Sequence, residues 1–126
     1  MHRAPDNSAV AVLGASTNEE RYSFMAVRML KEHNHRPIPV HPAGHAVDGV
    51  PGVKSLADIR EPVDTVSCYV NAQISDGEFE RLVSLKPRRV VFNPGAENEN
   101  LAARLEKEGI EVVRACTLVM LRTGQF

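Results

Sequence analysis

A short loop of small and polar residues, with an arginine behind it, is the stretch whose residue types could hold an anion. It reads Gly14-Ala15-Ser16-Thr17-Asn18 and is followed by Arg21 and Ser23. Gly14 allows a tight turn after an apolar run. The backbone N–H groups of such a turn and the N-terminus of the next helix attract phosphate. The stretch therefore predicts a phosphate site where the loop leads into a helix that begins near Ser23.

Other reactive side chains form no recognisable catalytic or metal-binding pattern. Four of the five histidines lie between His33 and His45, but no cysteine or paired carboxylate accompanies them at ligand spacing. We therefore expect no metal site. No Ser-His-Asp or Cys-His arrangement is readable, so we expect no catalytic residues and no enzymatic activity. Cys68 and Cys116 suggest no disulfide framework, and packing rather than reactivity is the expected role of Cys116.

The composition is that of an ordinary globular protein. The 126 residues are 43% hydrophobic and 25% charged, which predicts a single domain over residues 1–126. A formal net charge of −1 excludes a general attraction to nucleic acid or to anionic membranes. No apolar run approaches the ~20 residues that a membrane span needs, and the N-terminus lacks the apolar core of a signal peptide. We expect a cytoplasmic protein.

Short apolar runs alternate with amphipathic stretches along the chain, and this alternation predicts the elements that position the loop. After a leader at 1–8, we expect strands at 9–13, 38–42, 63–70, 89–93 and 110–114. Helices are expected at 23–33, 75–86 and 97–108, with one helical turn at 55–59 and a tail at 116–126 that packs on the core. This order predicts an α/β fold, a doubly wound, mainly parallel five-stranded sheet with helices on both faces.

Ligands of such sheets bind beyond the carboxyl ends of the strands, where the strand order reverses. The residues expected there are mostly small, amide-bearing or proline, so they offer hydrogen bonds and shape but little acid–base power. Besides Gly14 to Asn18 they are His41, Pro42, Val70, Asn71, Asn93, Pro94, Gly95, Ala96, Cys116 and Thr117. We interpret them as a site that holds a ligand rather than one that reacts with it.

Two classes of nucleotide compete for this site. A dinucleotide site normally has Gly-x-Gly-x-x-Gly after the first strand and an acidic residue at the end of the second. The loop here has one glycine, Gly14, and the second strand ends at His41-Pro42 without a carboxylate. Both features count against NAD. The missing carboxylate favours a ligand whose ribose carries a phosphate, namely coenzyme A or NADP.

Motifs along nearly the whole chain, in order from Val10 to about Leu121, point to one family. They are Gly14-Ala15-Ser16, Asn18, Arg21-Tyr22-Ser23, Val40-His41-Pro42, the Gly49 region, Asn93-Pro94-Gly95-Ala96 and Cys116. Their order and spacing resemble the CoA-binding domain family, which is similar to the N-terminal domain of the succinyl-CoA synthetase α subunit.

The resemblance implies a Rossmann-like domain with coenzyme A as its ligand. It implies that the CoA phosphates are surrounded by Gly14, Ser16, Asn18 and Arg21. It places Val40, His41 and Pro42 along the adenine and ribose, and it lines the path of the pantetheine arm with Val70, Asn71 and Asn93 to Gly95. A lysine commonly follows the second motif in the family, where this chain has Ala43. His41 or His45 is then the expected basic partner of the 3′-phosphate.

Three functional hypotheses remain to be distinguished. The first is a stand-alone protein that binds CoA or an acyl-CoA without catalysis of its own, because 126 residues leave no room for the further domains of succinyl-CoA synthetases. The second is an NAD(P)-binding Rossmann-type protein, or a fragment of a nucleotide-dependent enzyme. The third is an interaction module whose tail, Leu118 to Phe126, docks a protein partner or a second copy of the chain.

Overall fold

A computed structural model describes residues 2–126. Its centre is a sheet in the order β2-β1-β3-β4-β5, in which every neighbouring pair is parallel. The strands are β1 (Ala9–Leu13), β2 (Arg36–Val40), β3 (Thr65–Cys68), β4 (Arg89–Phe92) and β5 (Glu111–Arg114). The five-stranded parallel sheet expected from the sequence is confirmed.

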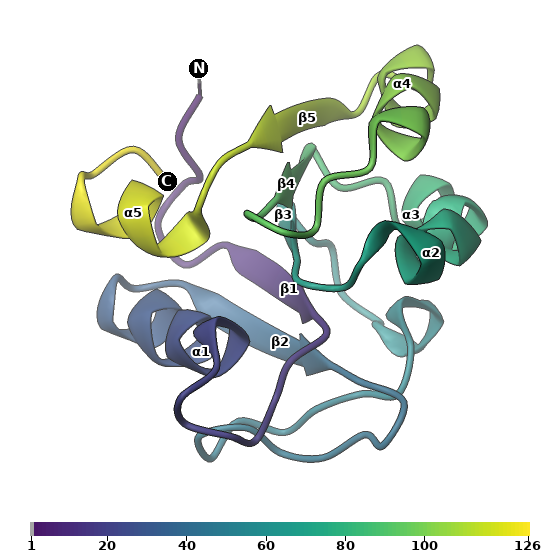
Figure 1. Cartoon of the computed structure of the whole chain (residues 1–126). Helices are drawn as coiled ribbons and strands as arrows, with labels where there is room; N and C mark the ends of the chain where they lie inside the picture. The colour runs from purple at the N-terminus through teal and green to yellow at the C-terminus, as the bar shows by residue number, and fades with distance from the viewer. Residues whose placement is uncertain (1) are drawn as a thin grey trace.

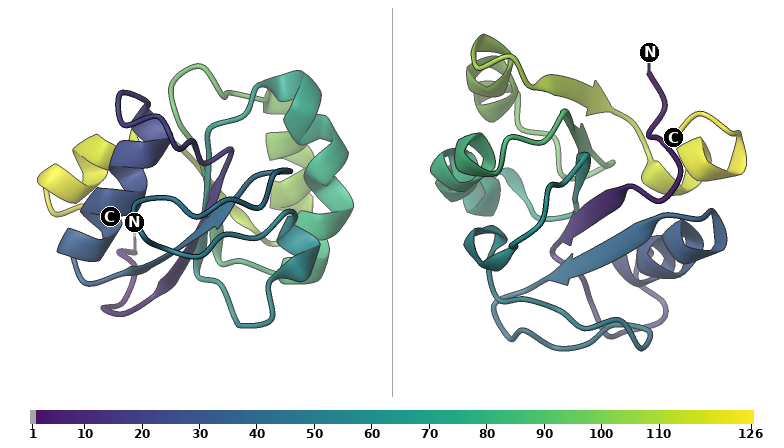
Figure 2. Two further views of the ribbon diagram at one scale, coloured as in Figure 1. Left: turned by 90° about the horizontal axis from the view of Figure 1, so that it is seen from below. Right: turned by 180° about the vertical axis from the view of Figure 1, so that it is seen from behind.

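Helices cover both faces of this sheet (Figures 1 and 2). On one face α1 (Tyr22–Glu32) lies beside α5 (Thr117–Arg122). The other face carries α2 (Ala72–Ser75), α3 (Phe79–Leu85) and α4 (Glu99–Lys107), together with the short 3-10 turns η1 (Leu56–Asp58) and η2 (Asp76–Glu78). The doubly wound α/β arrangement is therefore as expected. No helix within residues 2–126 is long and apolar enough to cross a membrane.

Strand β1 supplies apolar side chains to both layers of the core. Ala11 and Leu13 join a cluster on the side of α3 and α4, whereas Val10 and Val12 join a cluster on the side of α1 and α5. Because a parallel strand is buried on both faces, its sequence is a continuous apolar run. This property made the strand recognisable, and it places the end of β1, and so Gly14, inside the sheet between β2 and β3.

Strand β2 tolerates two prolines because it lies at the edge of the sheet. The N–H of His41 points away from β1 and donates to the carbonyl oxygen of Val53 at 3.0 Å. Pro37 and Pro39 have the same parity as His41, so their missing N–H groups fall on this outer side. The strand begins two residues earlier than expected and ends at Val40, which leaves His41 and Pro42 in the following loop.

Two helical segments differ from the expectation. The helix expected from Ser75 begins at Ala72, because the side-chain oxygen of Asn71 accepts the N–H of Ile74 at 3.0 Å and caps the first turn. The acidic residues after Ser75 had suggested a later start. Residues 117–122 form α5, which the sequence did not predict as a helix. Met120 and Leu121 of this helix pack in the same apolar cluster as α1.

Partial burial of the His35 ring makes the free energy of unfolding depend on pH. Its ring lies 5.4 Å from that of Phe126, centroid to centroid, and burial lowers the pKa of His35 below its ordinary value of 6.5. The unfolded chain therefore binds more protons than the folded chain just below pH 6.5. The stability that His35 contributes is present above pH 6.5 and is lost as the pH falls toward the lowered pKa of the folded state.

We expect the melting temperature to fall as the pH is lowered from 7 to 5.5, and His35→Gln to flatten this slope. Differential scanning calorimetry at a series of pH values measures the effect. His33→Gln is the matched control, because His33 is exposed where α1 ends, two residues before His35. An unchanged slope in His35→Gln would show that other groups cause the pH dependence.

Candidate functional site

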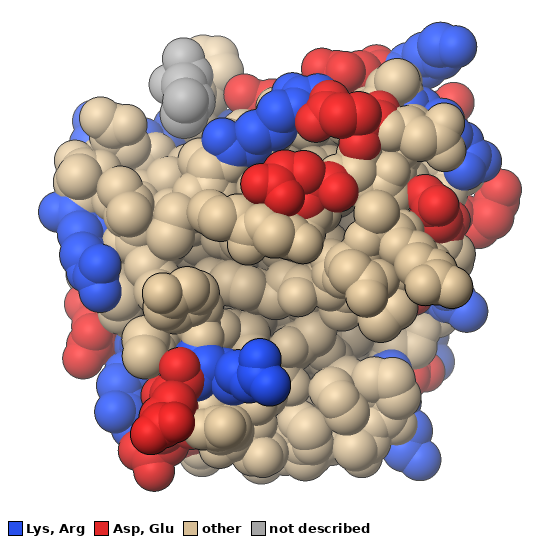
Figure 3. Space-filling view, viewed as in Figure 1, with Lys and Arg blue, Asp and Glu red and all other residues tan. Residues whose placement is uncertain are grey.

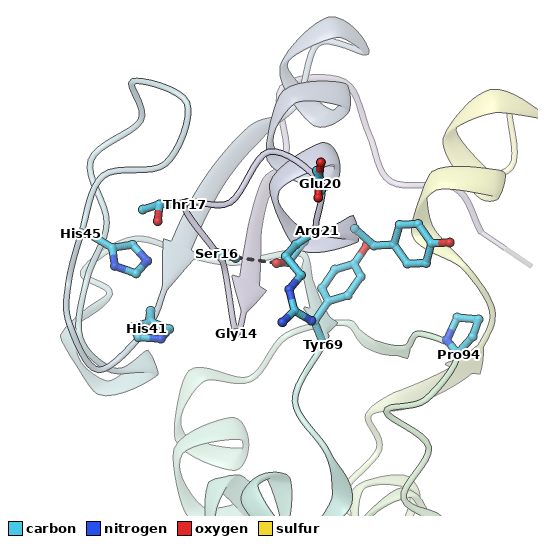
Figure 4. A pocket seen from close by; sticks show the side chains of 11 residues that line it. Gly14, Ser16, Thr17, Glu20, Arg21, His41, His45, Tyr69 and Pro94 are labelled. Carbon is cyan, nitrogen blue, oxygen red and sulfur yellow. Dashed lines mark hydrogen bonds between the residues drawn. The ribbon is translucent and has the colours of Figure 1, made fainter.

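A cavity of about 690 Å³ opens at the carboxyl edge of the sheet, within the usual size range of small-molecule sites. It is lined by Gly14, Ser16, Thr17, Glu20, Arg21, Tyr22, Ser23, His41, His45, Tyr69 and Pro94 (Figure 4). These residues follow β1, β2, β3 and β4. In the sheet β2 lies on one side of β1, and β3 lies on the other side. The cavity therefore lies at the point where the strand order reverses, the position at which open α/β sheets bind ligands.

The N-terminus of α1 opens on this cavity without a side-chain cap. Arg21 is the residue before the first turn, and the turn contains no acidic residue. The hydroxyl oxygen of Ser23, which could have capped a turn, accepts the N–H of Ser16 at 3.1 Å instead. The first N–H groups of α1 and the helix dipole therefore leave positive potential at the cavity.

Arg21 adds a full positive charge to the same place. Figure 4 shows its side chain extending from the start of α1 across the cavity, toward Tyr69. Within residues 2–126 no carboxylate forms a salt bridge with it, whereas Arg28, inside α1, is paired with Asp48. In Figure 3 the hollow at the centre of this face is lined mostly by uncharged side chains, with basic and acidic groups at its margin.

The loop amides are not arranged as expected. The N–H groups of Gly14 and Ala15 both donate to the carbonyl oxygen of Val40, at 2.9 and 3.2 Å. The N–H of Asn18 donates to the hydroxyl oxygen of Ser16 at 3.0 Å. The prediction that the first loop amides face an anion is therefore wrong, because both amides donate to the last carbonyl oxygen of β2. The positive potential comes from the start of α1 instead.

Two histidines form the wall on the side of β2. The rings of His41 and His45 are stacked with centroids 4.5 Å apart. Each is also fixed by a backbone contact: Nδ1 of His41 accepts the N–H of Ala43 at 3.0 Å, and Nε2 of His45 donates to the carbonyl oxygen of Ala15 at 3.0 Å. The pair therefore presents an ordered aromatic surface rather than two mobile side chains.

The loop that carries these histidines is fastened to α1 by Asp48. A carboxylate oxygen of Asp48 lies 3.0 Å from Nη2 of Arg28, and the other lies 2.9 Å from Nζ of Lys31. Their hydrogen bonds lower the pKa of Asp48 to about 2. Asp48 is thus ionised at neutral pH, and its two ion pairs join the loop that contains the histidines to α1.

Two tyrosines of the cavity were not among the site residues expected from the sequence, although Tyr22 belongs to the motif Arg21-Tyr22-Ser23. Tyr69 directly follows β3, and burial raises its pKa to about 12, so it stays protonated at neutral pH. The expected strand at 63–70 was too long and placed Tyr69 inside it. Tyr22, in the first turn of α1, is 66% exposed at the rim of the cavity. Its place directly after Arg21 was the signal that could have found it.

The structure brings only part of the predicted site to the cavity. Gly14, Ser16, Thr17, Arg21, Ser23, His41 and Pro94 line it. Residues outside the lining are Ala15, Asn18, Val40, Pro42, Val70, Asn71, Asn93 and Gly95.

Asn93 has other contacts in the interior. Its Nδ2 donates to the hydroxyl oxygen of Ser67 at 3.0 Å and to the carbonyl oxygen of Cys68 at 2.9 Å. Its Oδ1 accepts the N–H of Thr117 at 2.8 Å. Asn93 thus joins the ends of β3 and β4 to the start of α5. Asn71 is likewise engaged, as the cap of α2.

The cysteines lie outside the lining as well. Cys68 is buried in β3, and this burial raises the pKa of its thiol to about 11. Cys116 is half-buried before the first turn of α5. Within the described residues no group of three or more histidine, cysteine, aspartate or glutamate side chains could hold a metal ion.

The doubly wound sheet and the position of the cavity define the chain as a Rossmann-like domain of the kind that binds nucleotides at the carboxyl edge of its strands. Residues 8–122 match the family model described as CoA binding domain, and the chain belongs to this family. The family resemblance recognised from the sequence motifs is thereby confirmed.

A relative and a solved structure are similar to this chain over most of its length. The uncharacterized protein YneT of Bacillus subtilis (strain 168) is 27% identical over 104 residues, which cover 82% of this chain and 77% of YneT. The crystal structure of an uncharacterized protein matches with a TM-score of 0.90 and 42% identity, over 97% of this chain and 100% of the other.

A larger protein contains the same fold as one part. The dinucleotide forming acetyl-coenzyme A synthetase 1 of Ca. Korarchaeum cryptofilum, in complex with phosphate and ADP, matches with a TM-score of 0.74 and 21% identity. The match covers 87% of this chain and 26% of the synthetase. At this identity the likeness shows the fold alone.

Proposed function

We propose that this protein binds coenzyme A or an acyl-CoA in the cavity at the carboxyl edge of the sheet. The observation that carries the proposal is the start of α1, where an uncapped helix N-terminus adjoins Arg21, whose guanidinium forms no salt bridge within residues 2–126 although Glu20 also lines the cavity. Backbone N–H groups and a guanidinium together bind the diphosphate of a nucleotide. Membership of the CoA binding domain family supports coenzyme A as the nucleotide.

The remaining walls suit the other parts of such a ligand. His41 and His45 offer an aromatic surface beyond the end of β2, where doubly wound folds bind adenosine. Tyr69 and Pro94 lie on the opposite side of the cavity from these rings (Figure 4). Their apolar surfaces suit a flexible group such as the pantetheine arm. This arm would run from the diphosphate toward the end of β4.

We further propose that the protein holds its ligand without transforming it. The hydroxyl oxygens of Ser16 and Ser23 both accept backbone N–H groups of the loop. Among the described residues, no hydrogen bond joins a hydroxyl of the cavity to a histidine or a carboxylate. A serine without such a base is a weak nucleophile. This supports a binding protein, and we propose that the whole chain acts as one binding domain.

Isothermal titration calorimetry tests the proposal with CoA, acetyl-CoA and NADH as ligands. We expect CoA or acetyl-CoA to bind and NADH to bind much more weakly. Arg21→Gln should weaken CoA binding about tenfold, because a charge-assisted hydrogen bond to phosphate is lost. Arg122→Gln, at an exposed site in α5, is the matched control and should bind as the unmodified protein does.

Equal affinity for CoA and NADH would contradict the proposal, and so would the absence of any heat with CoA. Unchanged affinity of Arg21→Gln for CoA would show that Arg21 does not contact the diphosphate. Native mass spectrometry of the purified protein is an independent check, since a retained adduct with the mass of CoA or an acyl-CoA identifies the ligand directly.

A further inference from the structure

Lys54 lies against the loop that follows β2. A Cβ placed on Gly44 would be 2.8 Å from Cγ of Lys54 and 3.5 Å from its Cε, so the lysine stem runs across the glycine. The ammonium is one bond beyond Cε. Gly44 has a φ of +65°, and its missing side chain is the reason why the lysine can approach so closely.

Backbone pairing fixes Lys54 at the level of His41. Val53 forms a parallel bridge with Val40, and it exchanges hydrogen bonds with the outer side of β2: its N–H donates to Pro39 and its carbonyl accepts from His41. The residues that follow this bridge on the two segments are His41 and Lys54. This pairing places Lys54 beside the end of β2.

The charge of Lys54 is uncompensated. None of the salt bridges within residues 2–126 involves Lys54, and the loop's own carboxylate, Asp48, is engaged with Arg28 and Lys31. The segment 41–47, which contains the two stacked histidines, has no acidic residue. The end of β2 therefore has a basic character that nothing in the loop neutralises.

In doubly wound folds the end of the second strand binds the ribose of the adenosine. A carboxylate there binds a free ribose hydroxyl, whereas a basic residue accommodates a phosphate on the ribose. We infer that Lys54 contacts a phosphate on the adenosine ribose and selects ligands that carry one. This inference rests on the proposed function. The 3′-phosphate of CoA and the 2′-phosphate of NADP share the required chemistry.

Titration of two ligand pairs tests this role. Each of the unmodified protein, Lys54→Gln and Lys107→Gln is titrated with CoA and with 3′-dephospho-CoA, and then with NADPH and NADH. We expect the unmodified protein to bind CoA about fivefold more tightly than dephospho-CoA, the gain of one exposed charge-assisted contact. Lys54→Gln should lose this preference by weakening CoA alone. Lys107 is exposed at the end of α4. Lys107→Gln should therefore keep the preference of the unmodified protein for CoA.

The outcomes separate this inference from the proposed function. Equal binding of CoA and dephospho-CoA by the unmodified protein would overturn the role of Lys54 and leave CoA binding intact. A preference that survives in Lys54→Gln would do the same. A Lys54-dependent preference for NADPH over NADH, without CoA binding, would support the role of Lys54 and overturn CoA as the ligand. No binding of any of the four ligands would overturn both.

Discussion

Replacing Asn93 by leucine is expected to lower the free energy of unfolding by about 3 kcal/mol. Leucine has as many side-chain heavy atoms as asparagine and a larger volume, so it leaves no cavity, and the loss comes from the broken hydrogen bonds together with some overpacking. The N–H of Thr117 would be buried without its acceptor, and the carbonyl of Cys68 would lose its stronger donor. Asn93 is only 2% exposed, so water cannot replace these partners.

Chemical denaturation monitored by circular dichroism measures this loss. Asn100→Leu is the matched control, because Asn100 is exposed on α4 and its replacement should change stability by less than about 0.5 kcal/mol. A loss below about 1 kcal/mol in Asn93→Leu would show that the network around Asn93 contributes little. CoA titration well below the melting temperature adds a second readout: affinity should be retained if Asn93 is structural.

The case of Asn93 shows what could not be predicted from the sequence. Asn71, Asn93 and Asn98 all follow strands or precede helices, and an amide at such a position can bind a ligand or cap a helix equally well. Asn98 caps α4 with its Oδ1, while its Nδ2 donates to the hydroxyl of Ser75 at 2.9 Å. Which partner an amide finds depends on elements distant in the chain.

The sheet could be predicted because burial on both faces leaves a strong pattern. Residues 10–13 and 90–92 are continuous apolar runs, and they form all of β1 and β4 except the first residue of each strand. The hydrogen bonds from Gly14 and Ala15 to Val40 have no such pattern, because they depend on the register between β1 and β2. The same holds for Lys54, which reaches the end of β2 only through the pairing of Val53.

Replacing Gly14 by alanine is expected to cost about 3 kcal/mol of stability, from two separable causes. The φ of +89° strains any residue with a Cβ, and that Cβ would lie 2.8 Å from Cγ1 of Val70. Gly95 has nearly the same φ, +90°, but open space around it. Gly95→Ala therefore measures the strain alone, which we expect to cost about 1 kcal/mol.

The difference between the two alanine variants is the steric part, and it should disappear when Val70 is shortened. In a Val70→Ala background, Gly14→Ala should cost about as much as Gly95→Ala, which gives a coupling of about 2 kcal/mol in a double-mutant cycle. Denaturant unfolding of the four proteins of the cycle measures it. Equal costs at the two glycines in the unmodified background would show that the loop relaxes around the new methyl group. The close approach of Gly14 to Val70 would then contribute little to the preference for glycine at this position.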